Sequence, residues 1–290
     1  MKKFFLIIAT IIGLNLLIPI KPSQSFVPRI YEPNTKKLRK TGLEIGFTAA
    51  HLIKIGQFKE ATGLAKVALS LNPEEIDLWM ILAEGQIRSK KIDEAMDSIN
   101  KAKSINSNVA EIWFIEGSLA LNQNKPKLAI SSLSSGLKID DSNSRAYFQL
   151  GNARIMENQY QSALKDFKKS FSLNKKFWQA LNNEGLVLYE LNKESKAIKS
   201  WEKVLLINQD AEPKLALAAA LNKINPKNQK SITLTKEALN QSPNYIYKEY
   251  RKEQLWGKSL QAATAKLLSR TELSEEIEKA LINGDFKNEF

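Results

Sequence analysis

Cysteine is absent from the 290-residue chain, and histidine occurs once, at His51. The lack of cysteine excludes disulfides, thiolate zinc sites and a cysteine nucleophile, and a single histidine excludes a histidine-rich metal site. Glycine (12 residues) and proline (9 residues) are also few, which disfavours a turn-rich all-β protein and a disordered chain. Long stretches of Ala, Leu, Lys, Glu and Gln predict helix instead.

The sequence motifs of common catalytic and nucleotide-binding sites are missing as well. The chain contains no phosphate-binding loop, no dinucleotide-binding glycine motif, no zinc-protease motif and no nucleophile elbow. Residues 257–259 read Gly-Lys-Ser, but Lys252 stands where the phosphate-binding loop requires its first glycine. We therefore predict a protein that is not an enzyme and that holds neither a cofactor nor a metal.

Residues 1–25 have the composition of an export signal. Two lysines precede an apolar run over residues 4–20, and Ser23 and Ser25 precede a possible cleavage site. We expect either a cleaved signal peptide or an uncleaved membrane anchor. Both alternatives place the rest of the chain in the periplasm, in a thylakoid or at the outer face of an inner membrane. Residues 26–41, interrupted by Pro28 and Pro33, are predicted to be a linker.

Similar residues recur along the chain with a period of 34. Four sets repeat at this spacing and in phase with one another. They are alanines (Ala61, Ala95, Ala129, Ala163, Ala197), glycines (Gly117, Gly151, Gly185), large residues (Trp79, Trp113, Tyr147, Leu181) and aliphatic residues (Leu71, Ile105, Ile139, Leu173, Ile207). Such a period is typical of stacked helix pairs, in which each pair buries its apolar face only against its neighbours.

These positions resemble the tetratricopeptide repeat. Six copies fit residues 42–245, with starts at Gly42, Ile76, Ala110, Ser144, Trp178 and Glu212. The resemblance implies an all-α fold, a right-handed superhelix of about six helix–turn–helix repeats. Residues 246–290 leave the period, and their apolar stripe consists of Trp256, Leu260, Ala263 and Leu267. The stripe indicates either a helix that caps the array or a helix that docks a partner.

In the tetratricopeptide family, ligands usually lie in a concave groove lined by the first helix of each repeat. Carried over to this sequence, the partner-binding groove comprises Met80, Glu84, Phe114, Arg145, Phe148, Gln149, Asn152, Ile155, Gln179, Asn182, Asn183 and Tyr189. The resemblance implies that Asn152 and Asn183 bind a peptide backbone, because an amide offers both donors and an acceptor. Arg145 is expected to bind a carboxylate. The family's clamp lysine is replaced by Phe148 and Asn182, which argues against a clamp for chaperone tails.

These observations predict a non-catalytic protein–protein interaction scaffold. It would bind a protein or peptide in the groove, associate with a membrane and assist the assembly or stability of a membrane-associated complex. Two alternatives stay open. The basic linker favours an adaptor that binds lipid or an envelope polymer such as peptidoglycan. The net charge of +12 suits a nucleic-acid-binding repeat protein, but the groove residues contain few lysines or arginines, so we expect no nucleic-acid partner.

A finer resemblance rests on the basic-ended N-terminal segment, the repeats and the stretch EQLWGKSLQAATAKLL at residues 253–268. Together they look like a tetratricopeptide protein of photosynthetic bacteria that associates with thylakoid membranes and with the light-dependent protochlorophyllide oxidoreductase. This resemblance implies support of pigment synthesis or photosystem assembly without catalysis of either.

Overall fold

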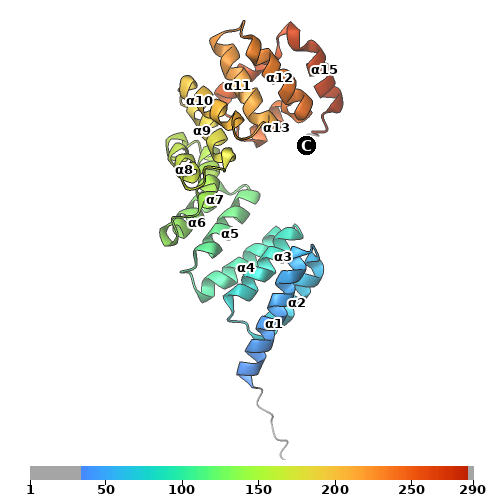
Figure 1. The fold of residues 1–290 in the computed structure, drawn as a ribbon. Helices are drawn as coiled ribbons and strands as arrows, with labels where there is room; N and C mark the ends of the chain where they lie inside the picture. The colour runs from blue at the N-terminus through green and yellow to red at the C-terminus, as the bar shows by residue number, and fades with distance from the viewer. Residues whose placement is uncertain (1–33, 287–290) are drawn as a thin grey trace, which may run out of the picture. The chain divides into compact units, whose positions relative to one another are not determined.

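The computed structural model describes residues 34–286, and within that range the chain forms helices and no strands. Helix pairs follow one another along the chain (Figure 1). They are α1 (Thr35–Lys54) with α2 (Phe58–Leu71), α3 (Ile76–Arg88) with α4 (Ile92–Ile105), α5 (Ala110–Asn122) with α6 (Pro126–Ile139), α7 (Ser144–Met156) with α8 (Tyr160–Leu173), α9 (Trp178–Glu190) with α10 (Glu194–Leu205), and α11 (Ala211–Ile224) with α12 (Gln229–Gln241). From α2 to α12, each helix packs against the next one, which confirms the predicted all-α array of helix pairs.

The first helices begin close to where the period places them. Four of them start at the predicted residues, Ile76, Ala110, Ser144 and Trp178, and α11 starts one residue early at Ala211. The first helix differs, because α1 begins at Thr35 and takes in residues 35–41 of the expected linker. No proline or glycine occurs between Pro33 and Gly42, and the intervening Lys, Leu and Arg residues favour helix.

The glycine set marks the points where the two helices of a pair approach each other closely. A Cβ atom on Gly117 would lie 2.5 Å from Leu133 Cγ, and one on Gly151 would lie 2.6 Å from the ring of Phe167. The same Cβ on Gly185 would lie 2.6 Å from Trp201 Nε1. A large side chain on the second helix therefore fills the space above each glycine, which offsets the roughly 1 kcal/mol that glycine costs a helix relative to alanine.

The tryptophans of the large-residue set anchor the turn that precedes each first helix. Trp79 Nε1 donates a hydrogen bond to the carbonyl of Pro73 at 2.8 Å, and Trp113 Nε1 donates to the carbonyl of Ser107 at 2.7 Å. The two donors and the two acceptors are each one period apart. Trp113 thus has a packing role, as its place in the period implied.

In the first five pairs, a left-handed residue lies in the turn between the two helices. This position has φ of 83° at Gly56, 60° at Lys90, 54° at Asn124, 57° at Asn158 and 55° at Asn192. Glycine and asparagine adopt this conformation readily, whereas a long side chain does so only with strain. Lys90 is therefore the strained member of the set.

We expect Lys90→Gly to raise the free energy of unfolding by about 0.5–1 kcal/mol, because it removes the left-handed strain at the cost of some chain entropy. Urea denaturation followed by circular dichroism measures the change. Asn124→Gly is the matched control and should change stability by less, since asparagine already tolerates the conformation. Destabilisation by Lys90→Gly would contradict this account of the turn.

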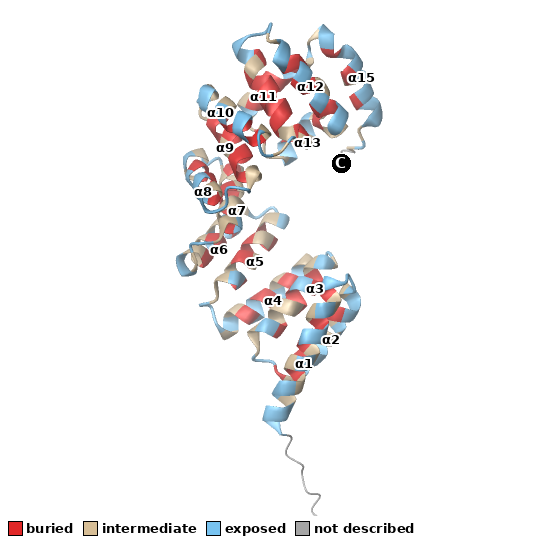
Figure 2. Ribbon diagram, in the orientation of Figure 1, coloured by how far each residue is buried: buried red, intermediate tan, exposed pale blue. Residues whose placement is uncertain are grey.

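The chain after α12 forms short helices that fold back onto the array. They are η1 (Pro243–Ile246), α13 (Lys248–Glu253), α14 (Lys258–Leu268), η2 (Thr271–Leu273) and α15 (Ser274–Asn283). Helix α14 packs against α11 and α9, and α15 packs against α12 and η1. All four residues of the predicted apolar stripe are buried, and α11 is buried along most of its length (Figure 2). The segment therefore covers the end of the array, as the capping alternative predicted.

Candidate interaction site on the first helices

The predicted groove residues of repeat four lie on α7 and stay accessible to differing degrees. Arg145 is exposed, whereas Phe148, Gln149 and Asn152 are half-buried. Gln149 Nε2 donates a hydrogen bond to Ser118 Oγ of α5 at 3.0 Å. The Phe148 ring packs 4.9 Å from the ring of Phe177. This face thus combines the exposed guanidinium of Arg145, the amide of Gln149 and the aromatic ring of Phe148.

Three predicted groove residues are buried in the core, so they face no ligand. Phe114 fills the space beside Gly136, where a Cβ would lie 2.6 Å from the Phe114 ring. Ile155 belongs to the largest core cluster, and Tyr189 packs 6.0 Å from the ring of Trp201. The assignment of Phe114, Ile155 and Tyr189 to the groove is therefore corrected, because packing against neighbouring helices buries them.

The asparagines of repeat five are also buried, and they hydrogen-bond each other. Asn183 Nδ2 donates to Asn152 Oδ1 at 2.9 Å, and Asn182 Nδ2 donates to Asn183 Oδ1 at 3.1 Å. Asn182 is 1% exposed and Asn183 is 8% exposed. In this conformation the amides of Asn152 and Asn183 hydrogen-bond each other across α7 and α9, so the predicted contact with a peptide backbone stays a prediction.

The chain's own C-terminal segment covers the first-helix face of repeats five and six. Trp256 Nε1 donates a hydrogen bond to Glu212 Oε1 at 2.9 Å. Glu190 accepts from the backbone N–H groups of Ser259, at 3.1 Å, and Leu260, at 2.9 Å. A carboxylate in this position satisfies two unpaired donors at the start of α14 and is stabilised by the helix dipole. Glu190 therefore acts as the N-terminal cap of α14, from a different helix.

Gly257 allows this docking. It precedes α14 with φ of −77° and ψ of 175°, an extended conformation open to any residue. A Cβ at this position would lie 2.6 Å from Glu190 Oε2. The glycine is therefore needed because the carboxylate packs directly against its backbone.

The pKa of the Glu212 carboxyl, which accepts the hydrogen bond from Trp256, is raised well above its usual value. Burial raises the pKa of its carboxyl to about 7, and hydrogen bonds from Trp256 and Asn182 act in the opposite direction. The carboxyl of Asp210 adds to the rise in pKa. The contact between Trp256 and the array thus includes a group that changes charge near neutral pH.

A second buried network holds the C-terminal segment together. The Arg251 guanidinium donates to the carbonyls of Tyr245, at 2.5 Å, and Ile246, at 2.9 Å. Its Nε donates to Gln261 Oε1 at 3.0 Å, which joins α13 to α14. Burial lowers the pKa of Arg251 to about 10, so the guanidinium stays charged at neutral pH.

The face that remains uncovered lies on repeats two to four. We call it the open face, and it comprises Met80, Glu84, Ile115, Arg145, Gln149 and Asn152. Met80 and Ile115 are half-buried. Glu84 is exposed and forms an ion pair with Arg88, with 3.9 Å between Glu84 Oε1 and Arg88 Nη2. Gln179, from repeat five, is half-buried. The open face therefore has apolar residues in its first part and polar residues near Arg145.

The sequence analysis did not find Glu190 and Glu212. Each lies at the end or start of a first helix, and their partners are 44 to 70 residues away in the sequence. Neither residue recurs with the period, so nothing local distinguished them from surface carboxylates. The apolar stripe that contains Trp256 was the only signal that the segment docks.

Other kinds of site have no support within residues 34–286. That range contains no group of three or more histidine, aspartate or glutamate side chains that could hold a metal ion. None of its helices is long and apolar enough to cross a bilayer. The predicted signal or anchor at residues 1–25 lies outside the described residues.

Helix pairs with a small residue at each close contact and a common 34-residue period define a helical-repeat protein. Residues 144–177 match the family model of the tetratricopeptide repeat. This match coincides with α7 and α8, the repeat with the clearest sequence pattern. No curated protein matches the sequence.

Several solved structures share the fold. PilF of Pseudomonas aeruginosa is 19% identical with a TM-score of 0.62, and the match covers 77% of this chain and 99% of that one. A MamA protein is 20% identical with a TM-score of 0.54, over 59% of this chain and 91% of that one. YrrB is 17% identical with a TM-score of 0.52, over 70% and 98%. At such low sequence identity, the structural similarity establishes the fold of the array alone.

Proposed function

We propose that this protein is a non-catalytic scaffold that binds a segment of a protein partner on the open face. One observation carries the proposal: α14 lies on the first helices of repeats five and six, held by an apolar stripe and by Glu190 and Glu212. The corresponding positions of repeats two to four are not covered by the described chain. YrrB is described as a tetratricopeptide protein with an unusual peptide-binding site, which supports the same use of the fold.

The charges of the open face favour a partner segment with both a carboxylate and an apolar part. Arg145 is exposed and forms no ion pair with another described residue, so it can bind a carboxylate with two parallel hydrogen bonds. Met80 and Ile115 offer apolar contact area at the other end. A segment that lies along the face would therefore place its acidic residue at repeat four.

We further propose that the protein acts on the exported side of a membrane, where it assists the assembly or stability of a membrane-associated complex. The basic and apolar N-terminal residues support export. The resemblance of residues 253–268 to a thylakoid-associated protein favours the machinery of pigment synthesis. N-terminal sequencing of the mature protein distinguishes a cleaved signal from an anchor. A mature protein that is recovered entirely from the cytoplasm would contradict the proposal.

Removing the exposed charges of the open face should weaken partner capture by about tenfold, the effect of losing about 1.4 kcal/mol of binding. The test variant is Glu84→Ala with Arg145→Ala. Both side chains are exposed, so the fold should persist. Affinity purification from the native membrane, with quantitative mass spectrometry, measures the captured proteins.

The matched control is Glu60→Ala with Lys101→Ala, which removes one exposed charge of each sign from the second helices α2 and α4. The control should capture the same partner as the unmodified protein. Equal capture by the two variants would show that the open face does not bind the partner.

A further inference from the structure

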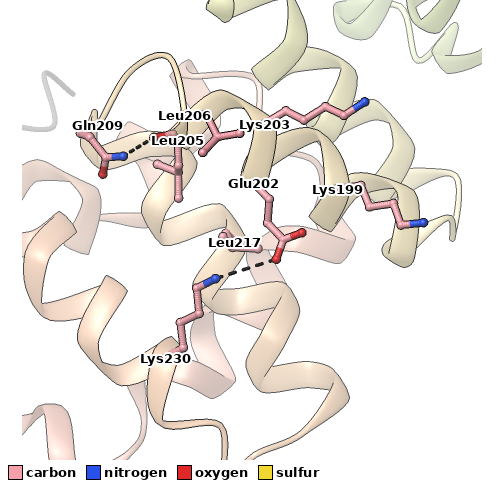
Figure 3. A pocket seen from close by; sticks show the side chains of 8 residues that line it. All are labelled: Lys199, Glu202, Lys203, Leu205, Leu206, Gln209, Leu217 and Lys230. Atoms are coloured by element: carbon pink, nitrogen blue, oxygen red, sulfur yellow. Dashed lines mark hydrogen bonds and ion pairs between the residues drawn. The ribbon is translucent and has the colours of Figure 1, made fainter.

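A cationic and apolar surface lies on the second helices of repeats five and six. It surrounds a pocket between α10, α11 and α12 (Figure 3). Leu205, Leu206 and Leu217 form the apolar part of the pocket, and Lys199, Lys203 and Lys230 form its cationic part. This surface does not use the first-helix positions that make up the open face.

Leu206 is the most prominent feature of this surface. It follows α10 and is 86% exposed, and the adjacent Ile207 is 47% exposed. No other large apolar side chain among the described residues is as exposed as Leu206. Two neighbouring aliphatic residues at a turn leave apolar area in water, which an apolar environment would remove.

Exposed lysines lie near this turn, and others occupy the equivalent positions of the preceding repeat. Lys165 and Lys169 of α8 are one period before Lys199 and Lys203 of α10, so each pair occupies equivalent positions on successive second helices. The acid of α8, Asp166, is buried against Arg154 at 2.6 Å. Figure 3 shows Lys230 directed toward Glu202, with 3.8 Å between the charged atoms. The exposed charge of α8 and α10 is therefore mainly positive.

We propose that this lysine–leucine surface binds an anionic membrane surface, with Leu206 and Ile207 at the level of the lipid headgroups and the lysines against the phosphates. Lysine suits this position because its apolar stem lies along the interface while the ammonium group reaches the headgroups. The combination of a protruding apolar turn with an extended cationic face fits a broad negative surface better than it fits a single acidic peptide. This binding goes beyond the proposed scaffold function, because it uses different helices.

The test measures vesicle binding by the full chain. Because the protein lacks cysteine, Gln209→Cys offers a single labelling site beside Leu206 for an environment-sensitive fluorophore. The fluorescence emission of the label should shift to shorter wavelength with vesicles of phosphatidylcholine and phosphatidylglycerol, but not with vesicles of phosphatidylcholine alone. Raising the salt concentration should reverse the shift, since exposed charges are screened.

A surface variant and a matched control identify the residues that bind. The surface variant combines Lys199→Gln, Lys203→Gln and Leu206→Ser, and we expect it to bind anionic vesicles at least about tenfold more weakly, given the contribution of each lysine near a charged membrane. The control combines Lys66→Gln, Lys101→Gln and Val67→Ser, exposed residues of α2 and α4. All versions carry the same N-terminal segment, so its contribution cancels.

Equal vesicle affinity of the two variants, or a label shift that is the same with neutral vesicles, would overturn the proposal. A label that responds to polyglutamate but not to anionic vesicles would also overturn it, in favour of an acidic protein partner. All three substituted side chains are exposed, so we expect the surface variant to fold. Thermal unfolding followed by circular dichroism checks this expectation.

Discussion

Gly257→Ala is expected to detach α14 from the first helices of repeats five and six. The added methyl group would lie 2.6 Å from Glu190 Oε2, so the carboxylate would have to leave the N–H groups of Ser259 and Leu260. A carboxylate that moves away costs the helix cap, about 1 kcal/mol, and one that stays in place costs about 1–3 kcal/mol of overpacking. Either outcome destabilises the docked segment by about 1–3 kcal/mol. Hydrogen exchange with mass spectrometry should show faster exchange throughout α14.

The matched control for this substitution is Gly63→Ala. Gly63 lies within α2, and a Cβ there meets nothing within 4 Å. The control should stabilise α2 by up to about 1 kcal/mol, because alanine favours helix more than glycine does. If α14 in the Gly257→Ala protein exchanged as slowly as in the unmodified protein, the contact with Glu190 would not hold the segment.

Raising the pH from about 5 to 8 should weaken the docking of the C-terminal segment, and Glu212→Gln should remove most of this dependence. The pKa of Glu212 is raised from 4.5 to about 7 in the folded protein. The stability that this shift contributes is therefore complete below pH 4.5 and is lost as the pH rises through about 7. A shift of this size corresponds to at most about 3 kcal/mol.

Other groups near Glu212 also titrate, so the effect of Glu212 has to be measured as the difference between the unmodified and Glu212→Gln proteins. Asp210 lies close enough to raise the pKa of Glu212, and Tyr245 has its own pKa raised by burial and by Glu212, so it stays neutral throughout. Burial also raises the pKa of Asp166 to about 6, which adds a pH dependence of the same sign in α8. Exchange of the Trp256 backbone amide, compared between the unmodified and Glu212→Gln proteins, separates the pH dependence due to Glu212 from that due to Asp166. Identical pH profiles would contradict the role of Glu212.

The period of 34 predicted the array well because it reports packing that recurs in every pair. The glycine set, for example, locates the same close contact at Gly117, Gly151 and Gly185, each beneath a large side chain of the second helix. A contact that recurs in successive pairs leaves a periodic pattern in the sequence. The fold and most helix starts could therefore be predicted from the residues alone.

The candidate site could be predicted only in part, because the C-terminal segment does not repeat. Asn182 and Asn183 are buried in hydrogen bonds with Glu212 and Asn152, and α14, from more than 60 residues away, packs against the same helix α9. No local pattern shows that Glu190 caps that helix. The open face survives as a prediction at Arg145 and Glu84, where no described segment covers the first helices.

The central claim is that the chain's own C-terminal segment occupies the first-helix face of repeats five and six. The amide hydrogens of Ser259 and Leu260 test it most directly, because each donates to a Glu190 carboxylate oxygen and would otherwise be unpaired at the start of a helix. Residue-resolved hydrogen exchange should find both amides protected in the unmodified protein and unprotected in Glu190→Ala. Rapid exchange of both amides in the unmodified protein, at the rate seen in Glu190→Ala, would contradict the claim.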